Sequence, residues 1–225
     1  MAQFRTHRPG QAMVRPEAPM SPEMEQSLAH TCSLPPGPGD ALIVVDVQND
    51  FLPAGALAVA QGDAVVPVLN RYLVEFERRG LPIFATRDWH PLGHCSFREQ
   101  GGPWPPHCIA ETRGAEFAPG LALPKSARVV SKAVGAEADA YSGFEGTDLA
   151  LQLQQLGCTR VFIGGLATDY CVRASTLDAL AHGFAVVVLE DAVRAVDVRP
   201  GDGLQALREM AAKGAHIACA DQVLA

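Results

Sequence analysis

The feature that most constrains this chain is a regular alternation, from residue 40 onward, of short apolar runs with segments of helical periodicity. Continuous apolar runs of roughly four to eight residues are typical of strands that are buried on both faces of a sheet. Runs of this kind occupy residues 41–45, 82–86, 128–132, 160–164, 184–189 and 216–219. They predict six strands.

Helical segments separate several of these runs. Apolar residues recur at positions 65, 68, 69, 72, 73 and 76, and we expect Asp63 to cap this helix and Gly80 to end it. Further helices are expected at residues 147–156, 168–182 and 203–213. Strands that are joined by helices pair in parallel and are covered on both faces. The pattern therefore predicts an α/β protein with three layers, α/β/α, around a six-stranded, mainly parallel sheet.

Residues 1–39 differ in composition from the rest of the chain. They hold seven of the 17 prolines and four of the five methionines, and prolines alternate with glycines just before the first apolar run. Proline removes a backbone donor and disfavours helix. We therefore predict a proline-rich N-terminal extension over residues 1–39, disordered in part, and one compact domain over residues 40–225.

Composition excludes several classes of protein. Hydrophobic residues make up 48% of the chain and charged residues 19%, which is too apolar for a disordered chain, yet no apolar run approaches the roughly 20 residues that cross a bilayer. The net charge of −7 disfavours nucleic acid and anionic membranes as partners. Six cysteines are spread without a CxxC pair, which indicates reduced thiols and a cytoplasmic protein.

Titratable residues stand at the ends of four predicted strands. Asp46 follows the first strand, Asp88 and His90 follow the second, Lys132 ends the third, and Cys171 comes soon after the fourth. The carboxyl ends of parallel strands meet at one edge of the sheet, where ligands bind beside the point at which the strand order reverses. We therefore expect these side chains to converge.

Cys171 has the setting of a nucleophile. Thr168 is the expected N-cap, so the thiol would lie in the first turn of a helix, where the helix dipole favours a thiolate. Gly164 and Gly165 precede that turn and allow backbone N–H groups to approach a substrate oxygen closely. The alternative is a small, buried apolar thiol without chemistry, and the sequence leaves it open.

A thiol nucleophile needs a proton acceptor, and no histidine lies close to Cys171 in the chain. Asp46 is the best candidate to take the thiol proton and to hand it later to a leaving group. Lys132 is placed to tune that carboxylate. The alternatives are a turn-forming role for Asp46 and a solvated strand end for Lys132.

Residues 86–107 are rich in histidine. Asp88 and His90, two residues apart, point to one face of extended backbone, and a further histidine from a loop would complete a three-ligand metal site with open positions. Such a site suits catalysis more than structure. Hydrogen-bonded loop histidines are the alternative. Cys95 and Cys108 lack the spacing of zinc-binding cysteines and are left out of the predicted site.

Five segments together resemble the nicotinamidase and pyrazinamidase branch of the isochorismatase-like cysteine hydrolases. They are IVVDVQNDF at 43–51, TRDWHP at 86–91, WPPHC at 104–108, AYSGFE at 140–145 and GGLATDYCV at 164–172. They follow the order of that family and span about residues 40–220. The resemblance implies the Rossmann-like, isochorismatase-like hydrolase fold.

The resemblance also implies the roles of individual residues. Asp46, Lys132 and Cys171 would be the catalytic triad. A cis peptide between Leu166 and Ala167 would aim the N–H groups of Ala167 and Cys171 at an oxyanion.

A metal and its ligands are implied in the same way. Asp88, His90 and His107 would bind one divalent ion, with His94 as a candidate fourth or outer ligand. Zinc is the first expectation, and iron and manganese are the alternatives, because this donor set accepts all three.

The implied reaction is the hydrolysis of nicotinamide, and with it pyrazinamide, to the acid and ammonia through a thioester on Cys171, as part of NAD salvage. Phe51, Trp104 and Tyr141 would form aromatic walls around the pyridine ring. The expected partner is this small substrate, and a homo-oligomer is compatible with it.

Two other functions compete with this interpretation. The same scaffold can act on N-carbamoyl or ureido compounds or on isochorismate, although those relatives are expected to lack the full metal set. A catalytically silent metal-binding or regulatory module is the second alternative. It has no need to retain Asp46, Lys132 and Cys171 together.

Overall fold

A computed structural model describes residues 33–225 of the protein, so residues 1–32 of the extension predicted for residues 1–39 lie outside the described residues. The described chain forms one six-stranded sheet in the order β3-β2-β1-β4-β5-β6. Every neighbouring pair is parallel. The strands are β1 (Asp40–Val45), β2 (Ile83–Asp88), β3 (Arg128–Lys132), β4 (Arg160–Leu166), β5 (Ala185–Arg194) and β6 (His216–Ala218). The predicted six-stranded parallel sheet is confirmed.

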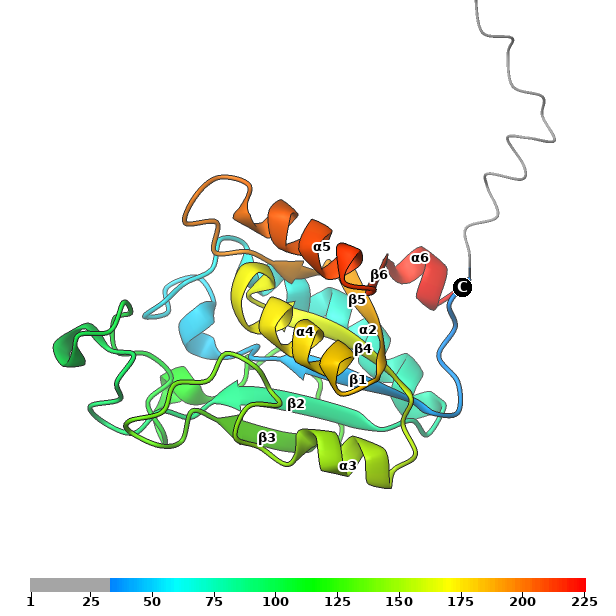
Figure 1. The fold of residues 1–225 in the computed structure, drawn as a ribbon, viewed down its shortest axis with the longest axis horizontal. Helices are drawn as coiled ribbons and strands as arrows, with labels where there is room; N and C mark the ends of the chain where they lie inside the picture. The colour runs from blue at the N-terminus through cyan, green and yellow to red at the C-terminus, as the bar shows by residue number, and fades with distance from the viewer. Residues whose placement is uncertain (1–32) are drawn as a thin grey trace, which may run out of the picture. The chain divides into compact units, whose positions relative to one another are not determined.

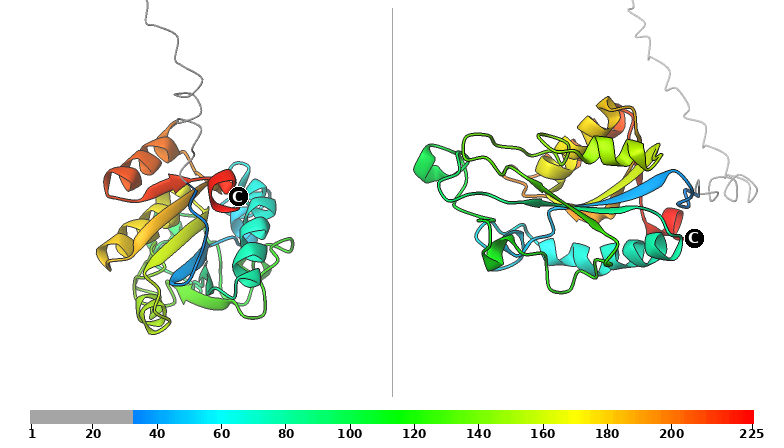
Figure 2. Two further views of the ribbon diagram at one scale, coloured as in Figure 1. Left: turned by 90° about the vertical axis from the view of Figure 1, so that its right-hand side faces the viewer. Right: turned by 90° about the horizontal axis from the view of Figure 1, so that it is seen from below.

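Helices cover both faces of this sheet (Figures 1 and 2). One face carries α2 (Val65–Arg78) and the short α6 (Ala220–Val223), and the other carries α3 (Leu149–Gln155), α4 (Arg173–Ala181) and α5 (Asp202–Ala212). The predicted three layers are therefore present. No helix within residues 33–225 is both long enough and apolar enough to cross a membrane.

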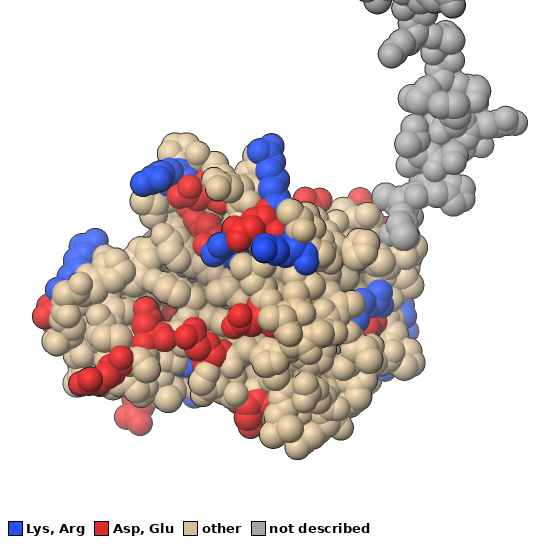
Figure 3. Space-filling view, in the orientation of Figure 1, with Lys and Arg blue, Asp and Glu red and all other residues tan. Residues whose placement is uncertain are grey.

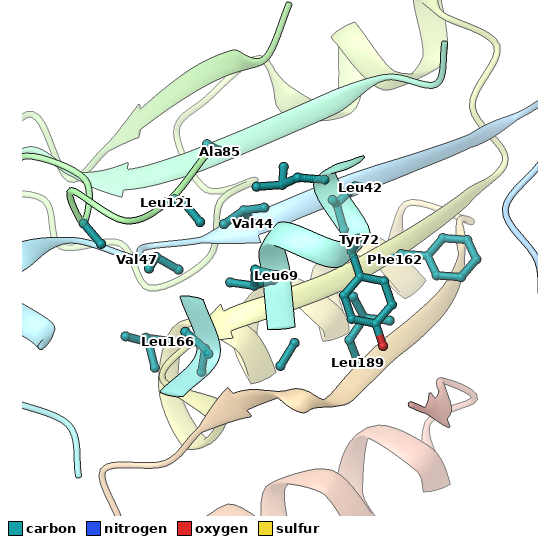
Figure 4. Packing of buried hydrophobic residues seen from close by; sticks show 14 of the residues in the cluster. Leu42, Val44, Val47, Leu69, Tyr72, Ala85, Leu121, Phe162, Leu166 and Leu189 are labelled. Carbon is teal, nitrogen blue, oxygen red and sulfur yellow. The ribbon is translucent and has the colours of Figure 1, made fainter. Parts of the chain in front are cut away.

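The core divides in two because each central strand is buried on both sides. Leu42 and Val44 of β1 pack toward α2, whereas Ile43 between them packs toward the helices of the opposite face. Figure 4 shows the first of these clusters, in which Leu69 and Tyr72 of α2 lie over the sheet. Alternate residues of a strand point to opposite faces, which is why a continuous apolar run is needed here.

The ends of α2 differ in part from the prediction. A 3-10 turn, η2 (Gly62–Ala64), precedes the helix, so Asp63 lies inside that turn and its side chain does not cap α2. Gly80 ends the helix as predicted, with a φ of 67°, which glycine adopts at little cost.

Strand β5 continues past the predicted residue 189 to Arg194, although Glu190 and Asp191 interrupt the apolar run. The carboxylate of Asp191 accepts hydrogen bonds from the Tyr72 hydroxyl at 2.9 Å and from the Ala220 N–H at 3.0 Å. A partnered charge can be kept inside a strand, and the sequence pattern alone does not reveal the partners.

The described residues that precede β1, residues 33–39, also contact the packed domain. Leu34 contacts the core on the α2 face, and its N–H donates to the Gln222 carbonyl at 2.8 Å. The carbonyls of Pro35 and Pro36 accept hydrogen bonds from arginine side chains of β4 and of the residue after α2.

A chain that begins at Asp40 is expected to be less stable than one that begins at Ser33, because it loses the packing of Leu34 and these three hydrogen bonds. We expect the free energy of unfolding, measured by urea denaturation, to fall by about 2–4 kcal/mol. Identical unfolding curves for the two chains would show that residues 33–39 contribute nothing to the fold.

Candidate active site

The strand order reverses between β1 and β4, and the predicted site lies at the carboxyl edge beside that point. Asp46 follows β1, Asp88 is the last residue of β2, and Lys132 is the last residue of β3. Cys171 lies in η5 (Thr168–Val172), the turn that follows β4. All four side chains are buried, and the structure brings them together as predicted.

Lys132 stands at the centre of this group. Its Nζ lies 3.1 Å from Asp46 Oδ2, donates to the Ala140 carbonyl at 3.0 Å and lies 3.5 Å from Cys171 Sγ. It also forms an ion pair with Asp88 Oδ1. The side chain is 1% exposed, so the ammonium has exchanged its hydration for these partners. The alternative of a solvated strand end does not apply.

The electrostatics of this group follow from burial and pairing. Burial opposes the charge of Lys132, but Asp46 and Asp88 outweigh it and raise the pKa of the ammonium well above its usual value. Burial and the charge of Asp88 raise the pKa of Asp46, although Lys132 acts against them. For Asp88, Lys132 and His90 overcome the effect of burial, and the pKa falls well below its usual range.

Asp46 is held toward the thiol. The chain has a φ of 50° at Asp46, where it leaves the strand, and the Thr86 hydroxyl donates to Oδ1 at 2.6 Å. A carboxylate oxygen of Asp46 lies within 4.8 Å of Cys171 Sγ, and the proximity of the two groups lowers the pKa of Asp46 and raises that of Cys171, in each case as a smaller effect than burial. A carboxylate with a raised pKa next to a thiol is suited to receive its proton.

The surroundings of Cys171 differ from the prediction. The turn Thr168–Val172 is π-helical and its N-cap is Ala167, so Thr168 does not cap a helix and α4 begins only at Arg173. Burial raises the pKa of the thiol well above its usual value, and Asp46 and Asp88 add to this against Lys132. Burial therefore favours the protonated thiol, in contrast to the thiolate that a helix dipole would favour.

Three potential metal donors converge beside this group. One donor atom from each of Asp88, His90 and His107 lies within 4.8 Å of the others. Asp88 Oδ2 is 3.6 Å from His90 Nε2 and 4.0 Å from His107 Nε2. His107 Nδ1 lies 2.8 Å from the Pro105 carbonyl, which directs Nε2 to the cluster. Both ring nitrogens of His90 are buried without a hydrogen-bond partner, so the cluster fits a divalent cation.

His94 lies next to this cluster but outside it. Its ring centroid is 4.2 Å from that of His90, while Nδ1 lies 2.8 Å from Ser96 Oγ and Nε2 lies 3.2 Å from the Ala138 carbonyl. Both nitrogens are thus used by the protein itself. This arrangement corresponds to an outer position around the three donors.

A pocket opens onto Cys171 and the three donors. The predicted walls Phe51, Trp104 and Tyr141 all line it. The sequence analysis did not single out several further lining residues, among them Leu57, Val59, Tyr170 and Val196.

The aromatic walls support one another. The indole N–H of Trp104 donates to the Tyr141 hydroxyl at 2.9 Å, and the Trp104 ring meets Tyr170 edge to face at 5.1 Å. The position of Tyr170 directly before Cys171 was a signal that could have identified it. Val196 follows β5 and carries no such signal in the sequence. Ala167 lines the pocket too, and the peptide bond between Leu166 and Ala167 is cis.

The fold and the site define a class of protein: a parallel α/β protein with a cysteine, a carboxylate and an ammonium buried at its strand ends beside a carboxylate–histidine cluster. A family model described as the isochorismatase domain matches residues 40–222. The chain belongs to the isochorismatase family.

Relatives with known names cover most of this chain. Nicotinamidase of Escherichia coli (strain K12) is 38% identical over an alignment of 201 residues, and the match covers 80% of this chain and 94% of that protein. The structure of pyrazinamidase of Pyrococcus horikoshii in complex with zinc is 53% identical, with a TM-score of 0.78 over 81% of this chain and 99% of that one. PnC1 of L. infantum in complex with nicotinate is 36% identical, with a TM-score of 0.79 over 85% and 98% of the two chains.

Replacing Lys132 by Met is expected to destabilise the metal-free protein in a pH-dependent way. Without the ammonium, the folded-state pKa values of Asp46 and Asp88 rise above their unfolded values. A carboxyl group of this kind stabilises the fold below its unfolded pKa, and the stabilisation is lost as the pH rises through the folded pKa. We expect a loss of about 3–5 kcal/mol at pH 8 and a smaller loss at pH 5, from urea denaturation with a chelator present.

The exposed Lys125 provides the control, since Lys125→Met removes a cation from the surface and should change stability little at either pH. A Lys132→Met deficit that is equal at pH 5 and pH 8 would contradict the role of the ammonium between two buried carboxylates.

Proposed function

We propose that this protein is a metal-containing cysteine amidohydrolase that converts nicotinamide to nicotinate and ammonia. The observation that carries the proposal is the position of Lys132 Nζ, which contacts Asp46, Asp88 and Cys171 at once beside an aromatic pocket. The names of the similar proteins, nicotinamidase and pyrazinamidase, agree with this chemistry. Pyrazinamide is an expected second substrate, because both rings carry a nitrogen meta to the carboxamide.

The proposed reaction begins with proton transfer from the Cys171 thiol to Asp46. The thiolate sulfur bonds to the carboxamide carbon, and the carbonyl oxygen takes the electron pair of its π bond. The amino group then leaves with the proton that Asp46 returns, so ammonia is released and a thioester remains. Water attacks the thioester, gives nicotinic acid and restores the thiol.

Lys132 provides a positive charge next to the group that is negatively charged before and after this proton transfer. When Asp46 becomes protonated, the ammonium stays next to the new thiolate, because Nζ lies 3.5 Å from Cys171 Sγ. The backbone N–H groups of Ala167 and Cys171 are the proposed donors to the oxyanion, since both residues border the pocket at the turn after β4.

Asp88, His90 and His107 are the residues that would hold the metal, and a bound divalent ion would supply a Lewis acid for the ring nitrogen of the substrate. Zinc is the proposed ion, because two imidazoles and one carboxylate suit it and the similar pyrazinamidase is described with zinc. The same donors accept iron or manganese. Phe51, Trp104 and Tyr141 would orient the ring so that the carboxamide faces Cys171.

A small neutral substrate and a cytoplasmic location complete the proposal. On the face shown in Figure 3, lysine and arginine side chains are scattered and form no continuous basic patch of the kind that would suit nucleic acid. The five cysteines among the described residues are free thiols, as expected in a reducing compartment. Nicotinate recovery in that compartment would serve NAD salvage.

Cys171→Ala is expected to lower ammonia release from nicotinamide by at least about a thousandfold, because Cys171 is the one cysteine among the described residues that lines the pocket. The measurement is a coupled ammonia assay with metal analysis of the same sample, and the metal content should stay unchanged. Cys158→Ala, which removes a buried thiol on the α3 side of the sheet, is the matched control and should retain turnover. Turnover by the Cys171→Ala protein would place the nucleophile elsewhere.

His107→Ala is expected to lower bound metal and ammonia release together, because it removes one of three donors. Zinc content and turnover would be measured on the same preparation before and after treatment with a chelator. His182→Ala, a change at the C-cap of α4 and outside the residues that line the pocket, should alter neither quantity. A chelated, metal-free sample that turns over at the full rate would contradict the metal part of the proposal.

A further inference from the structure

Two polar residues of the segment after β1, Gln48 and Asp50, have no role in the proposed reaction, yet both bind the backbone of the segments that carry the metal donors. The amide of Gln48 is fully buried and makes three hydrogen bonds. Its Nε2 donates to the Asp88 carbonyl at 2.8 Å and to the Ala115 carbonyl at 2.9 Å, and its Oε1 accepts from the Asp88 N–H at 2.8 Å. One side chain thus binds both backbone groups of a metal donor.

The place of Gln48 in the sheet explains this geometry. Strand β1 pairs with β2 up to Val45 and Thr86, and the Asp46 N–H still donates to the Thr86 carbonyl at 3.2 Å before the chain turns away. The next backbone groups of β2 that face β1 belong to Asp88, since alternate residues of a strand bond to the same neighbour. The Gln48 amide takes the position of the missing β1 backbone and extends the ladder to the donor residue.

Asp50 makes the corresponding contact to the other donor segment. Its Oδ2 accepts from the N–H of Cys108, the residue after His107, at 2.7 Å, and Oδ1 accepts from the Ala56 N–H at 3.2 Å. Cys108 has a φ of 46°, a conformation that is uncommon for residues other than glycine and requires support from its surroundings. A Cβ added to Gly114 would lie 2.1 Å from Asp50 Oδ2, so the loop backbone packs directly against this carboxylate.

We propose that Gln48 and Asp50 are positioning residues that fix the separation of Asp88 and His107 and thereby set the affinity for the divalent ion. Both belong to one short segment, so the end of β2 with Asp88 and the loop with His107 are held by the same piece of backbone. Donors that are held in place before the ion arrives lose less freedom when it binds. The inference rests on the metal site of the proposed function and assigns no new ligand.

The test is a zinc titration of the chelated, metal-free protein against a chromophoric competitor, at a temperature well below unfolding. Gln48→Met removes all three hydrogen bonds at similar size, and Asp50→Ala removes both acceptors. Each variant is expected to weaken zinc binding by about 10- to 100-fold. Asp50→Asn keeps an oxygen for the Cys108 N–H and should restore affinity to within about threefold, which a charge effect of Asp50 would not allow.

Tyr72→Phe is the matched control for lost stability, because it removes the hydrogen bond to Asp191 on the α2 face, outside the pocket. Its zinc affinity should equal that of the unchanged protein although its unfolding midpoint falls. Wild-type affinity in both Gln48→Met and Asp50→Ala, or an equal loss in Tyr72→Phe, would overturn the inference. If Gln48→Met does not fold, the comparison of Asp50→Ala with Asp50→Asn tests the inference by itself. If the unchanged protein binds no zinc, the metal site and this inference fall together, while the Cys171→Ala assay still tests amide cleavage.

Discussion

The site depends on one buried ammonium. Lys132 is 1% exposed and lies between the carboxylates of Asp46 and Asp88, which could not both remain ionised in the interior without it. The same ammonium is 3.5 Å from the thiol of Cys171. A proton can therefore pass from the Cys171 thiol to the Asp46 carboxylate without changing the net charge of the cluster. The parallel sheet brings these four groups together, because it places the carboxyl ends of β1, β2, β3 and β4 at one edge.

Asp88 joins the two halves of the site. Oδ1 faces Lys132, and Oδ2 faces His90 and His107, so one carboxylate belongs both to the charge cluster and to the proposed metal cluster. A cation bound by Asp88, His90 and His107 would draw negative charge from Asp88, the same carboxylate that pairs with the Lys132 ammonium. The backbone of Asp88 is held in turn by Gln48, which links the end of β1 to the metal donors. The nucleophile and the metal cluster are consequently parts of a single polar network inside an apolar sheet.

Much of this arrangement could be predicted from the sequence. The predicted bounds of β3, residues 128–132, are both correct, although this edge strand is only partly buried. The predicted end of α2 at Gly80 is correct as well, because glycine in the left-handed conformation leaves a clear local pattern. The gathering of Asp46, Lys132 and Cys171 followed from parallel topology. The cap of α2, the length of β5 and the π-helical turn at Cys171 did not follow, since each depends on partners that are distant in the chain.

The sequence by itself determined that titratable residues stand at the ends of the strands, and it determined the resemblance to a family. Hydrophobic periodicity and motif spacing, on which both depend, are local properties of the chain. Only the tertiary structure decided the protonation of the site: burial raises the pKa of Cys171 where a helix dipole suggested a thiolate, and Lys132 keeps its charge although it is buried. It also placed Tyr170 and Val196 in the pocket wall and Gln48 against Asp88. Desolvation and side-chain pairing depend on what surrounds a residue in three dimensions, and no spacing along the chain encodes them.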